Sequence, residues 1–256
     1  MDGNYQEYIN RVVQMTSPAN YEQQLHNIQS SPKFNQGKPV EFPGFSVITP
    51  PWAEENINNN LYQFVEKVQT QLKQLLGEKL FIALPPQSFH ITIADLIWEK
   101  SYLNAVKENA QFDDLLIQEI AHIFQEYKNI ITINNPLELE VLGLSIFPRA
   151  IAVCLAPTEA SYESIIKLRQ LIYQDEQIIK LSIEQQYEFA AHVTLGYFGK
   201  VDENLNPEQV KSVLINISDQ WLEEVPPLFQ IKNIQLRKFS DMITYIRQPD
   251  WATITL

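Results

Sequence analysis

The chain is organised around two stretches of one pattern, Phe89-His90-Ile91-Thr92-Ile93 and Ala191-His192-Val193-Thr194-Leu195. Polar and apolar residues alternate in each, which is typical of a β-strand with one buried face. Side chains two residues apart leave a strand on the same side, so the imidazole and the hydroxyl of each stretch face the same way. The sequence therefore predicts two strands that each present a His and a Thr together.

The segments around these strands alternate between helix and strand patterns. Helical spacing of apolar residues predicts helices over 57–76, 112–127, 162–172 and 207–221. Short apolar runs bounded by turn residues predict strands over 45–49, 80–84, 137–146, 151–155, 229–239, 242–246 and 251–256. This order predicts an α+β fold of two related halves, each contributing one His strand to a shared cleft.

No Gly/Ser-rich linker or low-complexity run divides the chain. Residues 1–36 are polar, with a short possible helix around 8–15 and an irregular remainder, and are expected to form an arm over the domain. Residues 37–256 are expected to form a single bilobal domain. With 256 residues and 45% hydrophobic content, the chain is long enough for a sizeable core.

Composition limits the classes of partner. The formal net charge is -12, which opposes binding to long nucleic acids or anionic membranes, because both depend on clustered Lys and Arg. The first residues lack the pattern of a secretory signal, and no apolar run is long enough to span a membrane. Cys154 is the only cysteine and lies in a predicted buried strand. We therefore expect a cytoplasmic protein with no intrachain disulfide and an inert core thiol.

The paired His-x-Thr pattern has several possible explanations. A half-buried His with a satisfied hydrogen bond accounts for one stretch alone, but the duplication weighs against it for both. A metal site is disfavoured because the same-face neighbour is Thr, a poor zinc ligand. A serine-type triad is disfavoured because no Gly-x-Ser-x-Gly elbow is present. Two imidazoles and two hydroxyls suit a phosphodiester, with one His as base, the other as acid, and the hydroxyls on the phosphate oxygens.

The two motifs resemble the signature of the 2H phosphoesterase superfamily. The resemblance implies a bilobal α+β fold with antiparallel sheets around a central cleft, helices packed outside, and metal-independent chemistry on 2′,3′-cyclic phosphates or 2′-5′ linkages. It assigns His90 and His192 as the acid/base pair, and Thr92 and Thr194 as the phosphate-holding hydroxyls. The segment from Lys33-Phe34 through Phe42-Pro43-Gly44 to Leu84-Pro85 and the first motif is similar to a poorly characterised bacterial branch, with Phe45-Ser46 where that branch tends to have Asn-Thr.

Same-face parity extends the predicted site. Ser88 precedes His90 by two residues, and Phe198 follows Thr194 by four, so both are expected to line the cleft. A bulge at Gly196 would bring in Tyr197 in place of Phe198. An aromatic ring there could stack on a base. Arg149 follows Pro148 in a predicted turn and could reach a phosphate.

The sequence thus predicts a metal-independent phosphodiesterase that needs no cofactor and acts on a small nucleotide or short oligonucleotide. The alternative is a nucleotide-binding module with the same cleft and no significant turnover. RNA end joining is a third possibility, but it calls for a basic track that the scattered Lys and Arg do not provide. We expect a monomer that binds neither long nucleic acid nor membranes.

Overall fold

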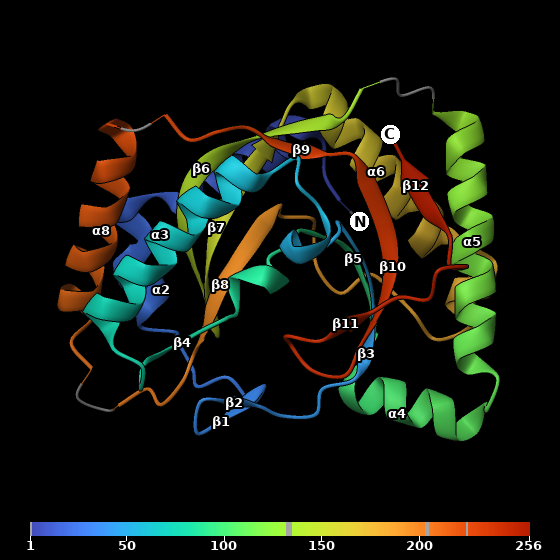
Figure 1. Ribbon diagram of the computed structural model, residues 1–256, viewed down its shortest axis with the longest axis horizontal. Coiled ribbons are helices and arrows are strands. Elements are labelled where there is room, and N and C mark those ends of the chain that lie inside the picture. The colour runs from blue at the N-terminus through green and yellow to red at the C-terminus, as the bar shows by residue number, and fades with distance from the viewer. Residues whose placement is uncertain (1, 132–134, 203–204, 224) are drawn as a thin grey trace.

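The computed structural model describes residues 2–131, 135–202, 205–223 and 225–256, and for residues 221–223 it describes the backbone alone. Within these residues the strands form two five-stranded antiparallel sheets and a small hairpin (Figure 1). The first sheet has the order β11-β10-β3-β5, with β12 also paired to β10. The second has the order β4-β8-β7-β6-β9. The predicted α+β class with antiparallel sheets is confirmed.

The bounds of the elements are as follows. The first sheet contains β3 (Gly44–Ile48), β5 (Thr92–Trp98), β10 (Asn233–Phe239), β11 (Tyr245–Ile246) and β12 (Thr253–Thr255). The second contains β4 (Phe81–Ala83), β6 (Leu137–Phe147), β7 (Ala150–Pro157), β8 (His192–Phe198) and β9 (Phe229–Ile231), and the hairpin is β1 (Phe34–Asn35) with β2 (Lys38–Pro39). The α-helices are α1 (Tyr5–Thr16), α2 (Tyr21–Leu25), α3 (Asn59–Leu76), α4 (Glu99–Glu108), α5 (Phe112–Ile130), α6 (Glu159–Gln174), α7 (Glu176–Lys180) and α8 (Pro207–Glu223).

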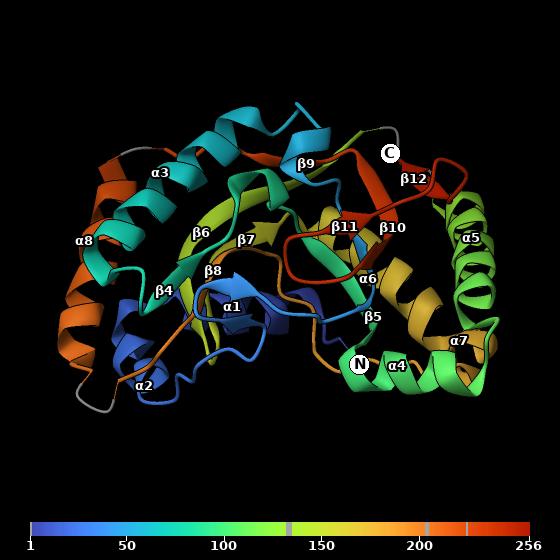
Figure 2. The same cartoon turned by 60° about the horizontal axis from the view of Figure 1, so that its bottom comes forward.

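Five of the helices lie outside the sheets at the two ends of the molecule. Figures 1 and 2 show α2, α3 and α8 at one end of the molecule and α4 and α5 at the other, with the sheets between them. Helix α3 is amphipathic and buries Leu61, Val65, Val68 and Leu72 against the second sheet, as its helical spacing predicts. Helix α4 was not predicted, because it buries only Tyr102 and so lacks a clear apolar period.

The two sheets meet at the two His strands. An isolated antiparallel bridge pairs Ile91 with Val193, and both side chains are fully buried. Ile91 is also held by Thr49, whose N–H donates to the Ile91 carbonyl at 2.9 Å and whose hydroxyl accepts from the Ile91 N–H at 2.9 Å. The apolar residue at the middle of each His-x-Thr pattern therefore joins the two halves of the fold.

The N-terminal region is more ordered than the sequence suggested. The expected irregular remainder after residue 15 is wrong for residues 18–25, which form a 3₁₀ turn and helix α2. A capping box between Asn4 and Glu7 begins α1, and Tyr8 and Tyr21 are buried, with hydroxyls that donate to carbonyls of β7 and β6. The division of the chain at residue 36 stays a prediction.

None of the helices in the described ranges is long and apolar enough to cross a membrane.

Candidate active site

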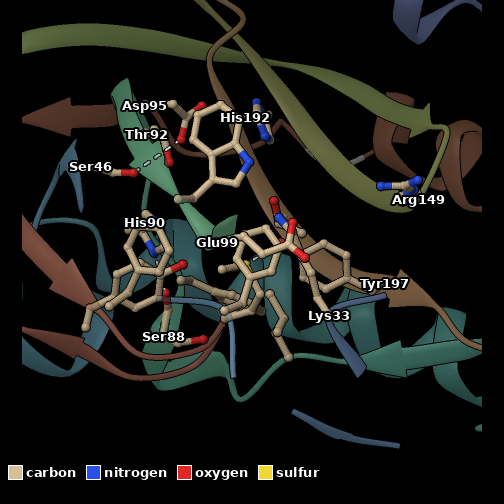
Figure 3. A pocket seen from close by; sticks show the side chains of 18 of the residues that line it. Lys33, Ser46, Ser88, His90, Thr92, Asp95, Glu99, Arg149, His192 and Tyr197 are labelled. Atoms are coloured by element: carbon tan, nitrogen blue, oxygen red, sulfur yellow. Dashed lines mark hydrogen bonds between the residues drawn. The ribbon is translucent and has the colours of Figure 1, made fainter. Parts of the chain in front are cut away.

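A pocket of about 340 Å³ lies where the two sheets meet (Figure 3). Its lining includes both His-x-Thr pairs, which converge although one pair comes from each sheet. The Ile91–Val193 bridge explains this arrangement, because alternation places the residues on either side of each bridging residue on the opposite face. Six of the seven predicted site residues line the pocket, namely Ser88, His90, Thr92, Arg149, His192 and Thr194.

The two imidazoles are oriented in the same way. The Nδ1 atom of His90 lies 2.7 Å from the Ser88 carbonyl oxygen, and that of His192 lies 2.7 Å from the Ala190 carbonyl oxygen. A carbonyl oxygen can only accept, so Nδ1 carries the proton in both rings. In the neutral rings Nε2 is then an unprotonated base. This is the tautomer that a general base needs, and a second proton on Nε2 would make either ring an acid.

A bulge follows each His-x-Thr pattern and changes which residues face the pocket. Thr92 pairs with Ile48 and Ala94 with Val47, so Ile93 is an extra residue in β5. Each bulge reverses the alternation, so the residue three positions beyond the Thr returns to the pocket face. On β5 that residue is Asp95, which lines the pocket and was missed by the sequence analysis.

The same irregularity in β8 corrects the prediction for Phe198. Thr194 pairs with Ala152 and Gly196 with Ile151, leaving Leu195 as the extra residue. Tyr197 consequently lines the pocket, whereas Phe198 is fully buried outside it. Gly196 permits this geometry, since a Cβ there would lie 2.5 Å from the Ile82 carbonyl oxygen. Gly196 was the sequence signal for the bulge in β8, and the bulge in β5 was not predicted.

Each imidazole packs against an aromatic ring. The ring centroids of His90 and Tyr245 are 4.5 Å apart, and those of His192 and Phe147 are 4.8 Å apart. Ser88 supports His90 from the other side through its carbonyl, and its own hydroxyl donates to the Pro85 carbonyl at 2.7 Å. These contacts fix the ring positions before any ligand binds.

Burial lowers the pKa of both imidazoles. For His90 the pKa falls to about 4, mainly through loss of solvent around the ring, and the charges of His192 and Arg237 lower it further. The pKa of His192 is also lowered by burial, but the nearby carboxylate of Asp95 acts in the opposite direction. Figure 3 shows Asp95 beside Thr92 on the His192 side of the pocket. Of the two rings, His192 is the one with an anion that stabilises its protonated form.

Charged groups of both signs complete the lining. Arg149 is exposed at the tip of the β6–β7 turn, and Lys33 reaches the pocket from the segment before β1. Asp95 accepts a hydrogen bond from the buried Ser46 hydroxyl at 3.2 Å. Lys33 was not predicted as a site residue, because no local sequence pattern distinguishes it from the other lysines.

The described residues give little support to a metal site or to a cysteine nucleophile. No three His, Cys, Asp or Glu side chains within them are grouped to hold a metal ion. Cys154 is fully buried in β7, and burial raises the pKa of its thiol to about 12. A thiol of that acidity is a poor nucleophile, in agreement with the inert core role predicted for it.

Comparison with known proteins finds a family model that matches part of the chain. Residues 33–148 match the family model 2H-phosphodiest, described as a domain of unknown function (DUF1868). This match, which covers somewhat less than half of the chain, supports the resemblance to the 2H phosphoesterase superfamily. The matched segment contains the first His-x-Thr pattern and ends before the second. The residues of the second pattern line the same pocket as those of the first. The predicted superfamily resemblance is thus confirmed, and it supports a phosphoesterase activity.

A solved structure shares the fold of this chain. The conserved protein of unknown function ATU0111 from Agrobacterium tumefaciens superposes with a TM-score of 0.61 at 14% identity, over 88% of this chain and 95% of that one. Weaker likeness is found to TT0787 of Thermus thermophilus, with a TM-score of 0.46 at 13% identity over 83% and 94% of the two chains. For LigT of E. coli complexed with 3′-AMP the TM-score is 0.42 at 12% identity over 85% and 99%. No curated protein matches the sequence.

Proposed function

We propose that this 2H phosphoesterase is a metal-independent phosphodiesterase that cleaves a 2′,3′-cyclic phosphate or a 2′-5′ phosphodiester in a small nucleotide or short oligonucleotide. The observation that carries the proposal is the Ile91–Val193 bridge, which brings His90 and His192 into one pocket with the same ring orientation. Thr92 and Thr194 lie beside them as donors for the non-bridging phosphate oxygens.

The surroundings of the two rings favour different roles. His90 has the low pKa of a ring held neutral and has cationic neighbours, which suits the general base. His192 faces the Asp95 carboxylate, which stabilises its protonated form and suits the general acid. In hydrolysis of a cyclic phosphate, His90 Nε2 takes a proton from water as the water oxygen bonds to phosphorus. His192 Nε2–H protonates the ribose oxygen as its bond to phosphorus breaks.

The aromatic rings at the pocket mouth suit the nucleoside. Trp98 and Tyr187 stack with their centroids 6.4 Å apart, and both line the pocket. Tyr187 is 67% exposed, so one of its faces is open to a base. Tyr197 is less suited to stacking, because it already contacts Phe34 and Lys33.

The proposed activity is tested by a panel of 2′,3′-cyclic mononucleotides and 2′-5′-linked dinucleotides, assayed by product analysis with and without a metal chelator. We expect turnover of at least one compound at the same rate in both conditions. Activity that disappears with the chelator contradicts the metal-independent mechanism. Calorimetric binding without any product would instead assign the chain to the nucleotide-binding alternative.

Asp95→Asn tests the assignment of His192 as the acid. Removing the carboxylate charge lowers the pKa of His192, so its protonated form is lost at lower pH. The alkaline limb of the kcat/KM profile should therefore move to lower pH. At a fixed pH above the limb, kcat/KM of the variant should be about tenfold lower than that of the unmodified chain for every pH unit by which the limb moves. The other charge that acts on His192 is Lys33, which is unchanged in this variant.

The matched control is Glu99→Gln, which neutralises another carboxylate of the same pocket. Its alkaline limb should stay where it is in the unmodified chain. An unchanged limb in Asp95→Asn, or equal displacements of the limb in both variants, would contradict the role given to Asp95.

A further inference from the structure

Two cations at the pocket have no carboxylate partner among the described residues. Lys33 and Arg149 both line it, and neither forms an ion pair there. The other arginines nearby are paired: Arg11 with Glu188, Arg169 with Asp2, and Arg237 with Glu54. Lys33 and Arg149 thus retain positive charge that a ligand can neutralise.

Lys33 is held in place rather than free in solvent. Its Nζ lies 4.8 Å from the ring centroid of Phe42 and 5.1 Å from that of Tyr197. Its backbone N–H donates to the Ser31 hydroxyl at 3.3 Å, and Ser31 itself donates from its backbone N–H to the Phe198 carbonyl at 2.8 Å. The aromatic rings stabilise the ammonium without cancelling its charge. The result is a preorganised cation beside β8.

Arg149 combines a fixed backbone with an exposed side chain. Its carbonyl accepts from the Phe198 N–H at 2.9 Å, and the preceding carbonyl of Pro148 accepts from the Gln29 N–H at 2.7 Å. The backbone that carries the guanidinium is therefore fixed next to the same end of β8 as Lys33. The guanidinium offers the bidentate donors that suit a phosphate.

The pocket continues past these two cations. A second cavity of about 770 Å³ shares Lys33, Thr92, Asp95, Arg149, His192 and Thr194 with the first. Figure 3 shows Arg149 set apart from the two imidazoles. A ligand whose phosphodiester lies between the imidazoles has room to extend into this second cavity.

We propose that Lys33 and Arg149 form a second anion subsite, and that the substrate is a small nucleotide carrying another phosphate group in addition to the one that is cleaved. The proposal rests on the proposed function for the position of the cleaved phosphate. It adds a substrate class, because the subsite selects nucleotides with two phosphates over those with one.

The test compares adenosine 2′,3′-cyclic phosphate with the same compound bearing a 5′-phosphate. Affinities are measured by calorimetry on the full chain with His90→Ala, which slows turnover enough for binding to be measured. We expect the 5′-phosphorylated compound to bind about tenfold more tightly or better, since a charge-assisted phosphate contact is among the stronger hydrogen bonds. The advantage should shrink as salt is raised.

Variants decide whether these two side chains are responsible. Lys33→Gln and Arg149→Gln should each reduce the ratio of the two affinities toward one, and Lys33→Arg should restore it. The matched control is Lys38→Gln, which should leave the ratio intact, because Lys38 is an exposed lysine of the neighbouring β1–β2 hairpin and does not line the pocket. Equal affinities, a ratio that survives both Gln variants, or no binding of either compound would overturn the subsite.

Failure of the subsite is distinguishable from failure of the proposed function. Turnover of the unphosphorylated cyclic nucleotide by the unmodified chain tests the function alone. Turnover without any preference for the second phosphate overturns the subsite and leaves the phosphodiesterase in place.

Discussion

His192→Ala is expected to lower kcat/KM on a 2′,3′-cyclic nucleotide by about 10²- to 10⁴-fold, and His90→Ala by a similar factor. Each variant removes one of the two groups that move a proton in the transition state. The ring of His192 is fixed by its 2.7 Å contact with the Ala190 carbonyl and by Phe147, so no neighbouring group can take its place without rearrangement. Steady-state kinetics on purified variants measures the effect.

An activated substrate separates the roles of the two rings. A phosphodiester with a p-nitrophenyl leaving group needs little protonation as it departs, so His192→Ala should recover most of its loss on that substrate. His90→Ala should not recover, since the attacking oxygen must still be deprotonated. The matched control is His122→Ala, because His122 has a side chain that is 70% exposed on α5, outside the pocket. Recovery in the His90 variant instead would reverse the assignment, and activity retained by both variants would exclude the mechanism.

Arg169→Gln is expected to destabilise the fold by about 3–5 kcal/mol, because it leaves a buried carboxylate without its partner. Arg169 Nε lies 2.8 Å from Asp2, and the two side chains are only 5% and 3% exposed. The same guanidinium donates to the carbonyl of Ile93 at 2.6 Å and to that of Tyr187 at 2.9 Å. Arg169 therefore ties the N-terminus to the bulge in β5 and to the segment that leads into β8.

Urea unfolding measures the loss, with Arg11→Gln as the control. Arg11 pairs with Glu188 in the same region, but these side chains are 29% and 51% exposed, so the control should lose only about 0–1 kcal/mol. Adding Asp2→Asn to Arg169→Gln should recover part of the stability by removing the unpaired charge. Equal losses for the two arginine variants would show that the Asp2–Arg169 pair contributes no more to the free energy of unfolding than the more exposed Arg11–Glu188 pair. Because the Ile93 carbonyl sits in the bulge between Thr92 and Asp95, a lower kcat should accompany the lower stability.

Much of the fold follows from local patterns in the sequence. Alternation of polar and apolar residues predicted β5 and β8, and helical spacing of apolar residues predicted α3, α5, α6 and α8. These patterns are informative because side-chain direction repeats every two residues in a strand and about every 3.6 residues in a helix. The same logic placed His and Thr on one face of each strand, and the recurrence of the pattern indicated a phosphoesterase. It failed for Phe198, because a bulge changes the period within a strand.

The sequence by itself determined the types of most elements, the paired His-x-Thr patterns and the chemistry that two imidazoles allow. Only the tertiary structure decided that Ile91 pairs with Val193, that bulges bring Asp95 and Tyr197 to the pocket, and that Lys33 lies between two aromatic rings. The physical reason is that these features depend on register and contact between segments far apart in the chain. Alternation within a strand carries no information about which partner it meets or where an extra residue is inserted.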